Sequence, residues 1–176
     1  MAPPALDRSR LEALLADAGV QLDGEWLLIG GAAAATWFAD GRTTDDIDLI
    51  ALDATRVRRM AVMDLAVAHG LPVEAVNSSA DYFVRRIEGW RDELVPLVQG
   101  PRAVIFRPTP TLFLLLKLAR LSAVDLDDCL ALIEHCRRVV DPIDRARVAA
   151  ALSALPATTD AALAARRAAL AAAITP

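Results

Sequence analysis

Residues 26–53 read WLLIGGAAAATWFADGRTTDDIDLIALD and hold the pattern that decides the fold. An apolar run ends in two glycines, a stretch of small residues follows, and a polar turn leads to Asp46, Ile47 and Asp48. Side chains alternate between the two faces of a strand, so both aspartates are expected on one face and Ile47 in a core on the other. The segment therefore predicts a strand, a short helix and a second strand that holds two carboxylates side by side.

The glycines and the aspartates together have the chemistry of a nucleotide site. Paired carboxylates suit Mg²⁺ (or Mn²⁺), which proteins commonly bind through one or two carboxylates and the phosphates of a substrate. Gly30 and Gly31 lack a Cβ atom, so backbone N–H groups at a helix start can approach the phosphates of an NTP closely. Asp46 and Asp48 are therefore the candidate metal ligands. The alternative is a buried strand flanked by solvated acids, with the glycines in a tight turn.

The same residues resemble the signature of the nucleotidyltransferase superfamily with the DNA polymerase β-like fold. That signature is a hydrophobic residue, Gly, Gly or Ser, and then Asp-hydrophobic-Asp, which here falls at 29–31 and 46–48. Arg42 and Thr44 make the segment similar to the variant found in small bacterial AbiEii-like and related nucleotidyltransferase families. The resemblance implies an α+β fold, with a small mixed β-sheet core and flanking helices. It also implies catalytic aspartates, and phosphate or loop contacts from Arg42 and Thr44.

A second resemblance lies in the C-terminal half, where Lys117-x-x-Arg120 precedes Asp125 and Asp128. This pattern looks like the Lys helix and the Asp-x-x-Asp motif of AbiEii-like proteins. It implies that Lys117, the only lysine in the chain, binds the triphosphate within reach of the acidic strand, with Arg120 beside it. Asp125 would assist catalysis and Asp128 would shape the nucleotide site. From the residues alone, a snorkelling lysine and an ordinary helix N-cap at Asp125 are the alternatives.

The third catalytic carboxylate of the wider superfamily has no clear equivalent, since Glu74, Asp92 and Glu93 are candidates only by rough position. Two interpretations therefore stay open. The first is a Mg²⁺-dependent nucleotidyltransferase that moves an NMP from an NTP to a hydroxyl of RNA (tRNA-like) or protein, as a toxin or resistance component. A cognate antitoxin or a second copy of the chain would be its partner. The second is a catalytically degenerate nucleotide-binding or partner-binding module of the same fold.

Composition limits the class of protein. The chain has 176 residues, of which 55% are hydrophobic and 24% charged, as in a globular protein. Its net charge of −4 and pI of about 5.2 create no global positive field, so any nucleic-acid contact must be local. Residues 56–59 and the pair Arg85-Arg86 are basic, but each fits the solvated face of a helix. We find neither a signal peptide nor an apolar span of 18 residues, which predicts a cytoplasmic protein without a membrane segment.

Periodicity and capping residues predict the remaining elements. Met60, Met63, Tyr82 and Phe83 are expected to face the core. A sheet core is expected over residues 1–108, with a helical subdomain, residues 109–176, packed on it. The expected helices are 5–18, 32–38, 54–69, one ending at 87, 112–123, 126–139, 141–152 and 160–174, and the expected strands are 25–29, 46–51, 71–76, 93–98 and 103–106.

Overall fold

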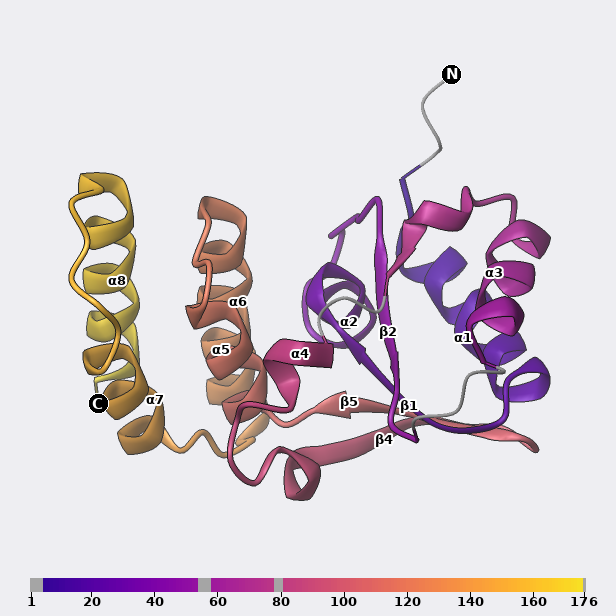
Figure 1. The fold of residues 1–176 in the computed structure, drawn as a ribbon. Helices are drawn as coiled ribbons and strands as arrows, with labels where there is room; N and C mark the ends of the chain where they lie inside the picture. The colour runs from indigo at the N-terminus through magenta and orange to yellow at the C-terminus, as the bar shows by residue number, and fades with distance from the viewer. Residues whose placement is uncertain (1–4, 54–57, 78–80, 176) are drawn as a thin grey trace. The chain divides into compact units, whose positions relative to one another are not determined.

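Residues 5–53, 58–77 and 81–175 are described by a computed structural model with a mixed α+β architecture (Figure 1). A sheet and its helices lie in one unit, Met1–Pro108, and the helices that follow form another, Thr109–Pro176. The expected α+β class, with a mixed sheet and flanking helices, is confirmed. Within the described ranges, no helix combines the length and the apolar character needed to cross a membrane.

The sheet of the first unit has five strands in the order β3-β2-β1-β5-β4. Its central strand β1 pairs antiparallel with β2 and parallel with β5, while β2 and β3 are parallel and β4 and β5 form an antiparallel hairpin. The expected strands around the Gly-Gly and Asp-x-Asp motifs and the expected strands at 93–98 and 103–106 are thus confirmed. The strands are β1 (Gly24–Ile29), β2 (Ile47–Ala51), β3 (Val76–Asn77), β4 (Leu94–Gln99) and β5 (Ala103–Pro108).

The buried strand β1 and the helices around it form the core of this unit. From Trp26 to Ile29 every side chain is buried, so β1 is covered on both faces. Three helices pack on the sheet or on one another: α1 contacts β5 and α3, and α2 contacts β1 and β2. Their bounds are α1 (Arg8–Gln21), α2 (Gly30–Trp37) and α3 (Arg58–Ala68).

The prediction that Met60 and Met63 face the core is wrong. Both are exposed, whereas Val62, Leu65 and Ala66 on the same helix are buried. Both sets repeat at helical spacing, so the sequence period alone does not choose between them. The first four residues of the expected helix, 54–57, lie outside the described residues.

The segment after α3 also differs from the prediction. Instead of a strand at 71–76 there is a 3₁₀ turn, η1 (Val73–Ala75), which Pro72 begins, and only the two-residue β3. The next helix, α4 (Asp81–Val84), has a single turn, and Tyr82 and Phe83 on it are exposed rather than inward-facing. A second 3₁₀ turn, η2 (Trp90–Glu93), leads into β4. Residues 78–80, where the start of this helix was expected, lie outside the described residues.

The second unit is built from helices. Thr109 caps the first of them, with Pro110 at its start, and Asp160 caps the last. Two helix starts differ from the prediction, because Ser122 rather than Asp125 and Asp144 rather than Asp141 are the N-caps. The helices are α5 (Pro110–Leu118), α6 (Ala123–Val139), α7 (Arg145–Ser153) and α8 (Ala161–Ile174). Phe113 and Leu132 are fully buried here, and both cysteines are buried and free, as expected for small hydrophobes.

Candidate functional site

The glycine pair and the acidic strand meet where β1 passes into α2. Ile29, the last residue of β1, is the register partner of Asp48 on β2. Gly30 then adopts a positive φ of 69°, and a Cβ atom added there would overlap Oδ2 of Asp48. Glycine is therefore required at position 30 for two reasons, the left-handed backbone and the close approach of a carboxylate.

Thr44 and Arg42 lie against the second glycine. A Cβ atom added at Gly31 would come within 2.9 Å of Thr44 Oγ1 and 3.1 Å of Arg42 Nη2. Thr44 is buried, and its backbone N–H and C=O pair with Leu6 at 3.0 and 2.8 Å. Its Oγ1 lies 3.0 Å from Oδ1 of Asp46, to which the hydroxyl can donate. Thr44 therefore fixes the loop that carries Arg42 and Asp46 next to the start of α2.

The alternation predicted for Ile47, Asp48 and Leu49 is confirmed, but Asp46 does not lie on the strand as expected, because β2 begins at Ile47. Ile47 and Leu49 are buried, whereas Asp48 between them is only half-buried. Asp46 precedes β2 and is exposed. Through Thr44 it is tied to the neighbourhood of Gly31, just as Asp48 is placed against Gly30. Both carboxylates thus belong to the same end of the β1–α2–β2 unit.

This arrangement has donors for a cation and for a phosphate. The first N–H groups of a helix lack intrahelical acceptors, and the side chain of the N-cap residue of α2, Ile29, has no acceptor to offer them. The positive end of α2 and the Arg42 guanidinium therefore suit phosphate oxygens. The two carboxylates suit a hard cation that completes its shell with water and phosphate oxygens, as Mg²⁺ commonly does.

Among residues 5–53, 58–77 and 81–175, no third protein ligand is found beside the two aspartates. Within the described residues, no three Asp, Glu, His or Cys side chains form a group that could hold a metal ion. The rough candidates lie on the 3₁₀ turns, Glu74 on η1 and Asp92 and Glu93 on η2. Asp46 and Asp48 are therefore the candidate ligands at this junction, and two carboxylates are as many as proteins commonly give to Mg²⁺.

The residues of the second resemblance form a cluster in the helical unit. Lys117 Nζ lies 2.9 Å from Asp125 Oδ1 and 2.9 Å from Asp128 Oδ2, and its side chain is only 10% exposed. Burial acts to lower the pKa of Lys117, but the hydrogen bonds and charges of Asp128 and Asp125 outweigh it and raise the pKa above its usual value. The lysine is therefore charged at neutral pH and paired on both sides.

Asp125 is held ionised by the residues around it. Arg120 Nε lies 3.0 Å from its Oδ2, and the N–H and Oγ of Ser122 donate to the same oxygen at 2.9 and 2.7 Å. Burial acts to raise the pKa of Asp125, but the hydrogen bonds from Arg120, Lys117 and Ser122 hold it well below its usual range. Asp125 and Ser122 thus form a capping box at the start of α6.

The structure therefore brings together Lys117, Arg120, Asp125 and Asp128, the four residues that the sequence singles out in this unit. It adds Ser122, which sequence reasoning missed although Ser-x-x-Asp before an apolar run is a recognisable capping pattern. The expectation that Asp125 is the N-cap is wrong by three residues, because its side chain accepts from the N-cap instead. A snorkelling Lys117 is also excluded, since its ammonium is buried between carboxylates. Triphosphate binding by Lys117 stays a prediction.

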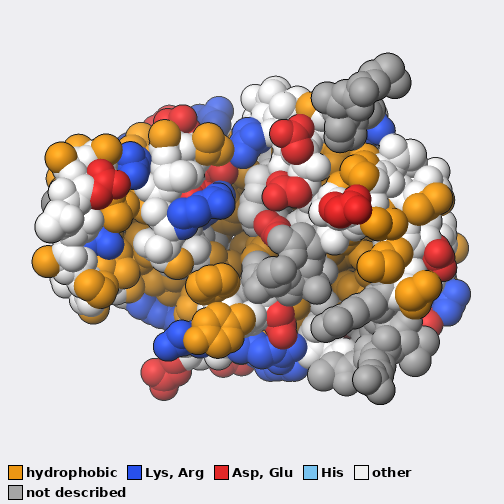
Figure 2. All heavy atoms as spheres, turned by 45° about the horizontal axis from the view of Figure 1, so that its top comes forward, with side chains coloured by type: hydrophobic (Ala, Val, Ile, Leu, Met, Phe, Trp, Pro, Cys, Tyr) orange, Lys and Arg blue, Asp and Glu red, His pale blue; other side chains and the backbone are white. Residues whose placement is uncertain are grey.

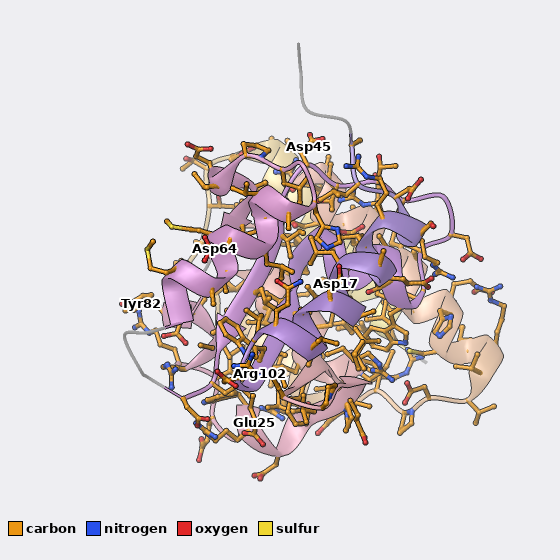
Figure 3. The ribbon with its side chains drawn as sticks, turned by 90° about the vertical axis from the view of Figure 1, so that its right-hand side faces the viewer. Asp17, Glu25, Asp45, Asp64, Tyr82 and Arg102 are labelled. Carbon is orange, nitrogen blue, oxygen red and sulfur yellow. The ribbon has the colours of Figure 1, made fainter. Side chains whose placement is uncertain are left out.

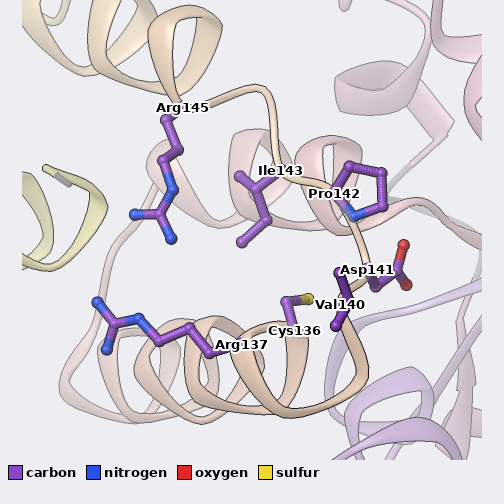
Figure 4. Close-up of a pocket in the computed structure, with 7 residues that line it drawn as sticks. All are labelled: Cys136, Arg137, Val140, Asp141, Pro142, Ile143 and Arg145. Atoms are coloured by element: carbon purple, nitrogen blue, oxygen red, sulfur yellow. The ribbon is translucent and has the colours of Figure 1, made fainter.

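A cavity of about 290 Å³ lies elsewhere in the helical unit (Figure 4). Arg137 and Arg145 face each other across it, and both lie within hydrogen-bonding distance of the carbonyl oxygen of Ala173, at 3.3 and 3.4 Å. Arg145 also donates to Ile174 O at 2.9 Å. Because carbonyls at a helix C-terminus favour cations, the two arginines stabilise the last turn of α8. None of the predicted site residues lines this cavity.

Comparison of the chain with models of known protein families, with curated proteins and with solved structures finds no match. Its function must therefore be inferred from the chemistry of the cluster at the start of α2 and of the cluster between α5 and α6.

Proposed function

We propose that this chain is a Mg²⁺-dependent nucleotidyltransferase that moves an NMP from an NTP to a hydroxyl of RNA or protein. The observation that carries the proposal is the junction of β1, α2 and β2. There, Gly30 lies under the Asp48 carboxylate, and Gly31 lies beside Thr44 and Arg42. A carboxylate pair at a helix start that has neither side-chain cap nor Cβ atoms is suited to a metal-bound triphosphate.

In this proposal each group has one task. Asp46 and Asp48 hold Mg²⁺ (or Mn²⁺), which neutralises charge on the triphosphate. The N–H groups at the start of α2 and the Arg42 guanidinium bind phosphate oxygens, and Thr44 keeps the loop in place. The acceptor oxygen forms a bond to the α-phosphorus, the bond from that phosphorus to the bridging oxygen breaks, and pyrophosphate leaves. The hydroxyl proton passes to solvent.

The resemblance to AbiEii-like proteins adds two further proposals. One is that Lys117 and Arg120 contact the triphosphate and that Asp125 and Asp128 hold the lysine in position for it. Arg120 supports this because its side chain is 80% exposed, whereas Lys117, which is 10% exposed, would reach the triphosphate only when the junction of α5 and α6 opens. The other is a toxin or resistance role, for which growth arrest on induced expression, relieved by Asp48→Asn, is the test.

A second candidate function is a nucleotide-binding module without transferase activity. It is favoured by one observation, the lack of a third acidic ligand beside Asp46 and Asp48 within the described residues. Such a module would bind an NTP and release it unchanged.

Labelled nucleotides separate the two functions. The protein is incubated with each NTP carrying a radioactive α-phosphate, with Mg²⁺ or Mn²⁺ and a cell extract, and the products are resolved as RNA and protein. Label on either product, lost in Asp48→Asn and kept in Asp64→Asn, supports transfer. Asp64 is a suitable control because it is an exposed carboxylate on α3 (Figure 3). Nucleotide binding without label supports the module. The absence of both nucleotide binding and label contradicts both functions.

A further inference from the structure

Aromatic and arginine side chains gather on the outside of the first unit between residues 81 and 93. The side chains of Tyr82 and Phe83 on α4 are 61% and 52% exposed, which is unusual for rings in a protein with few aromatic residues. Tyr82 lies at the periphery in Figure 3, and in Figure 2 hydrophobic and basic side chains lie next to one another below the centre of the face drawn. We call this the aromatic–arginine surface; its members are Tyr82, Phe83, Arg86, Trp90 and Arg91.

The planar groups of this surface are held in fixed relation to one another. The rings of Tyr82 and Phe83 meet edge to face, with centroids 5.5 Å apart. Arg86 lies 5.0 Å from the centroid of the Tyr82 ring and also donates to its hydroxyl at 2.6 Å. Arg91 lies 4.9 Å from the Trp90 ring. Arg85 lies 5.8 Å from the same ring, so pairs of a ring and a guanidinium occur three times in this segment.

The charges of the segment indicate what kind of ligand fits. Arg85 is paired with Asp81 at 2.7 Å in addition to its contact with the Trp90 ring, whereas Arg86 and Arg91 contact rings and the uncharged oxygens of Tyr82 and Leu52. The four acids of the segment, Asp81, Glu88, Asp92 and Glu93, outnumber its three arginines, so the segment carries no net positive charge. A ligand recognised here gains more from stacking on flat groups than from long-range attraction.

We infer that the aromatic–arginine surface binds an unpaired stretch of nucleic acid. Proteins bind single strands by stacking bases on aromatic rings and guanidinium planes, with arginines beside the backbone phosphates. In a duplex the base faces are stacked on one another and only the base edges are exposed in the grooves, so exposed rings cannot stack on the bases, and a surface without net positive charge attracts the phosphates weakly. The balance of rings over charge on this surface therefore favours a single strand.

The surface also lies on the chain segment that adjoins the acidic strand. Asn77 on β3 is the register partner of Asp48, and only four residue steps separate Asn77 from Asp81. Four steps span at most about 14 Å of chain. At the other end of β2, Arg91 Nη2 donates to the carbonyl oxygen of Leu52 at 3.1 Å. The segment that carries the surface is thus tied to β2 at two points, the strand that pairs with Asp48 and the residue after β2.

This position deepens the proposed function, on which the following step rests. A strand bound on the surface would supply the acceptor hydroxyl. Its oxygen would form the bond to the α-phosphorus of the NTP as the bond to pyrophosphate breaks and the hydroxyl proton passes to solvent. An unpaired nucleic-acid end is therefore the acceptor class that this surface favours over a protein hydroxyl.

Binding is measured without NTP or metal, by fluorescence anisotropy with end-labelled strands of about 12 nucleotides, within the usual size range of such sites. RNA, DNA of the same sequence and a duplex are compared. We expect the RNA or DNA single strand to bind and the duplex to bind more weakly. Tyr82→Ala should weaken single-strand binding about 5- to 100-fold, while Tyr82→Phe, which keeps the ring, should not. Arg86→Ala should reduce the slope of log affinity against log salt by about 0.7.

Two exposed side chains of the same unit provide matched controls. One is Met63 on α3, and the other is Arg102, which precedes β5 and pairs with Asp23 (Figure 3 for Arg102). Both lie outside the surface, so their replacement by Ala should leave strand binding unchanged. No binding of any strand at low salt would overturn the inference. So would equal binding of duplex and single strand, or equal losses in the control variants.

Combination with the labelling assay distinguishes the two proposals. Single-strand binding through Tyr82 in a protein that binds no NTP means that the transferase proposal fails and the surface stands. If Tyr82→Ala leaves the rate of transfer to a macromolecule unchanged, the surface proposal fails and the transferase stands. Label on protein instead of RNA has the same meaning. Asp48→Asn should lose transfer and keep its affinity for the strand.

Discussion

The carboxylate of Asp48 lies so close to Gly30 that position 30 has no room for a Cβ atom. This pair joins the glycine and acidic motifs, which are eighteen positions apart in the sequence. It follows from the antiparallel register of β1 and β2, in which Ile29 is opposite Asp48. A glycine that begins a helix and an aspartate inside a strand thus form one site because two strands pair.

Gly30→Ala should lower the free energy of unfolding by about 2 to 4 kcal/mol, because it adds backbone strain of about 1 to 2 kcal/mol to the overlap with Asp48. Gly70→Ala is the matched control, since Gly70 has a similar φ of 66° and open space around it. Chemical denaturation of both variants separates strain from overlap. Equal losses in the two variants would contradict the close approach of the carboxylate.

Asp48→Asn should leave the metal-free protein within about 1 kcal/mol of wild type, because the half-buried charge is screened by water and its loss relieves repulsion from Asp46. With Mg²⁺ and NTP at about 100 times the dissociation constant, wild type should gain about 2.7 kcal/mol and the variant nothing. Thermal melts with each NTP measure this difference. If no combination of metal and nucleotide raises the wild-type melting temperature, the aspartates are not a nucleotide site.

Lys117→Met should destabilise the helical unit by about 3 to 5 kcal/mol, because it removes the cation between two buried carboxylates and keeps the aliphatic stem. Arg120→Met, which removes an 80% exposed cation from the same cluster, should cost less than about 1 kcal/mol. Urea denaturation monitored by circular dichroism gives both values. A Lys117→Met variant as stable as wild type would exclude the paired arrangement.

The same cluster predicts how stability depends on pH. The pKa of Asp125 in the folded chain lies below its ordinary value of 3.8, so its contribution is complete above that pH and is lost as the pH falls further. The pKa of Lys117 is raised above 10.5, so its contribution is complete below that pH and is lost as the pH rises through the folded value. The free energy of unfolding should therefore decline both as the pH falls below 3.8 and as the pH rises above 10.5. Asp125→Asn should flatten the acid side; an unchanged acid slope would contradict the role of Asp125.

Much of the first site could be predicted because its signals are local. Alternation in a strand placed Ile47 inside and Asp48 outside, and two consecutive glycines indicated close approach at a helix start. What could not be predicted is which partner approaches, because the register of Ile29 and Asp48 depends on pairing between distant segments.

The errors have equally local causes. On α3, Met60 and Met63 have the same helical spacing as the buried Val62 and Leu65, and packing against α1 decides between them. At the start of α6, Ser122 and Asp125 are both good capping residues, and the helix uses both in a reciprocal pair. Tyr82 and Phe83 were expected inside because they are large rings, and the shortness of α4 leaves them exposed.

A final consequence concerns chemical labelling. The chain offers one lysine amine, and that amine is buried, protonated and held by Asp125 and Asp128. Acylating reagents attack only the uncharged, accessible form of an amine, so Lys117 should react only when the junction of α5 and α6 opens. Mass spectrometry of the peptide that contains Lys117 would then time the opening of that junction. Lys117 is thus a native probe of local unfolding at this junction, and no label has to be introduced by mutation.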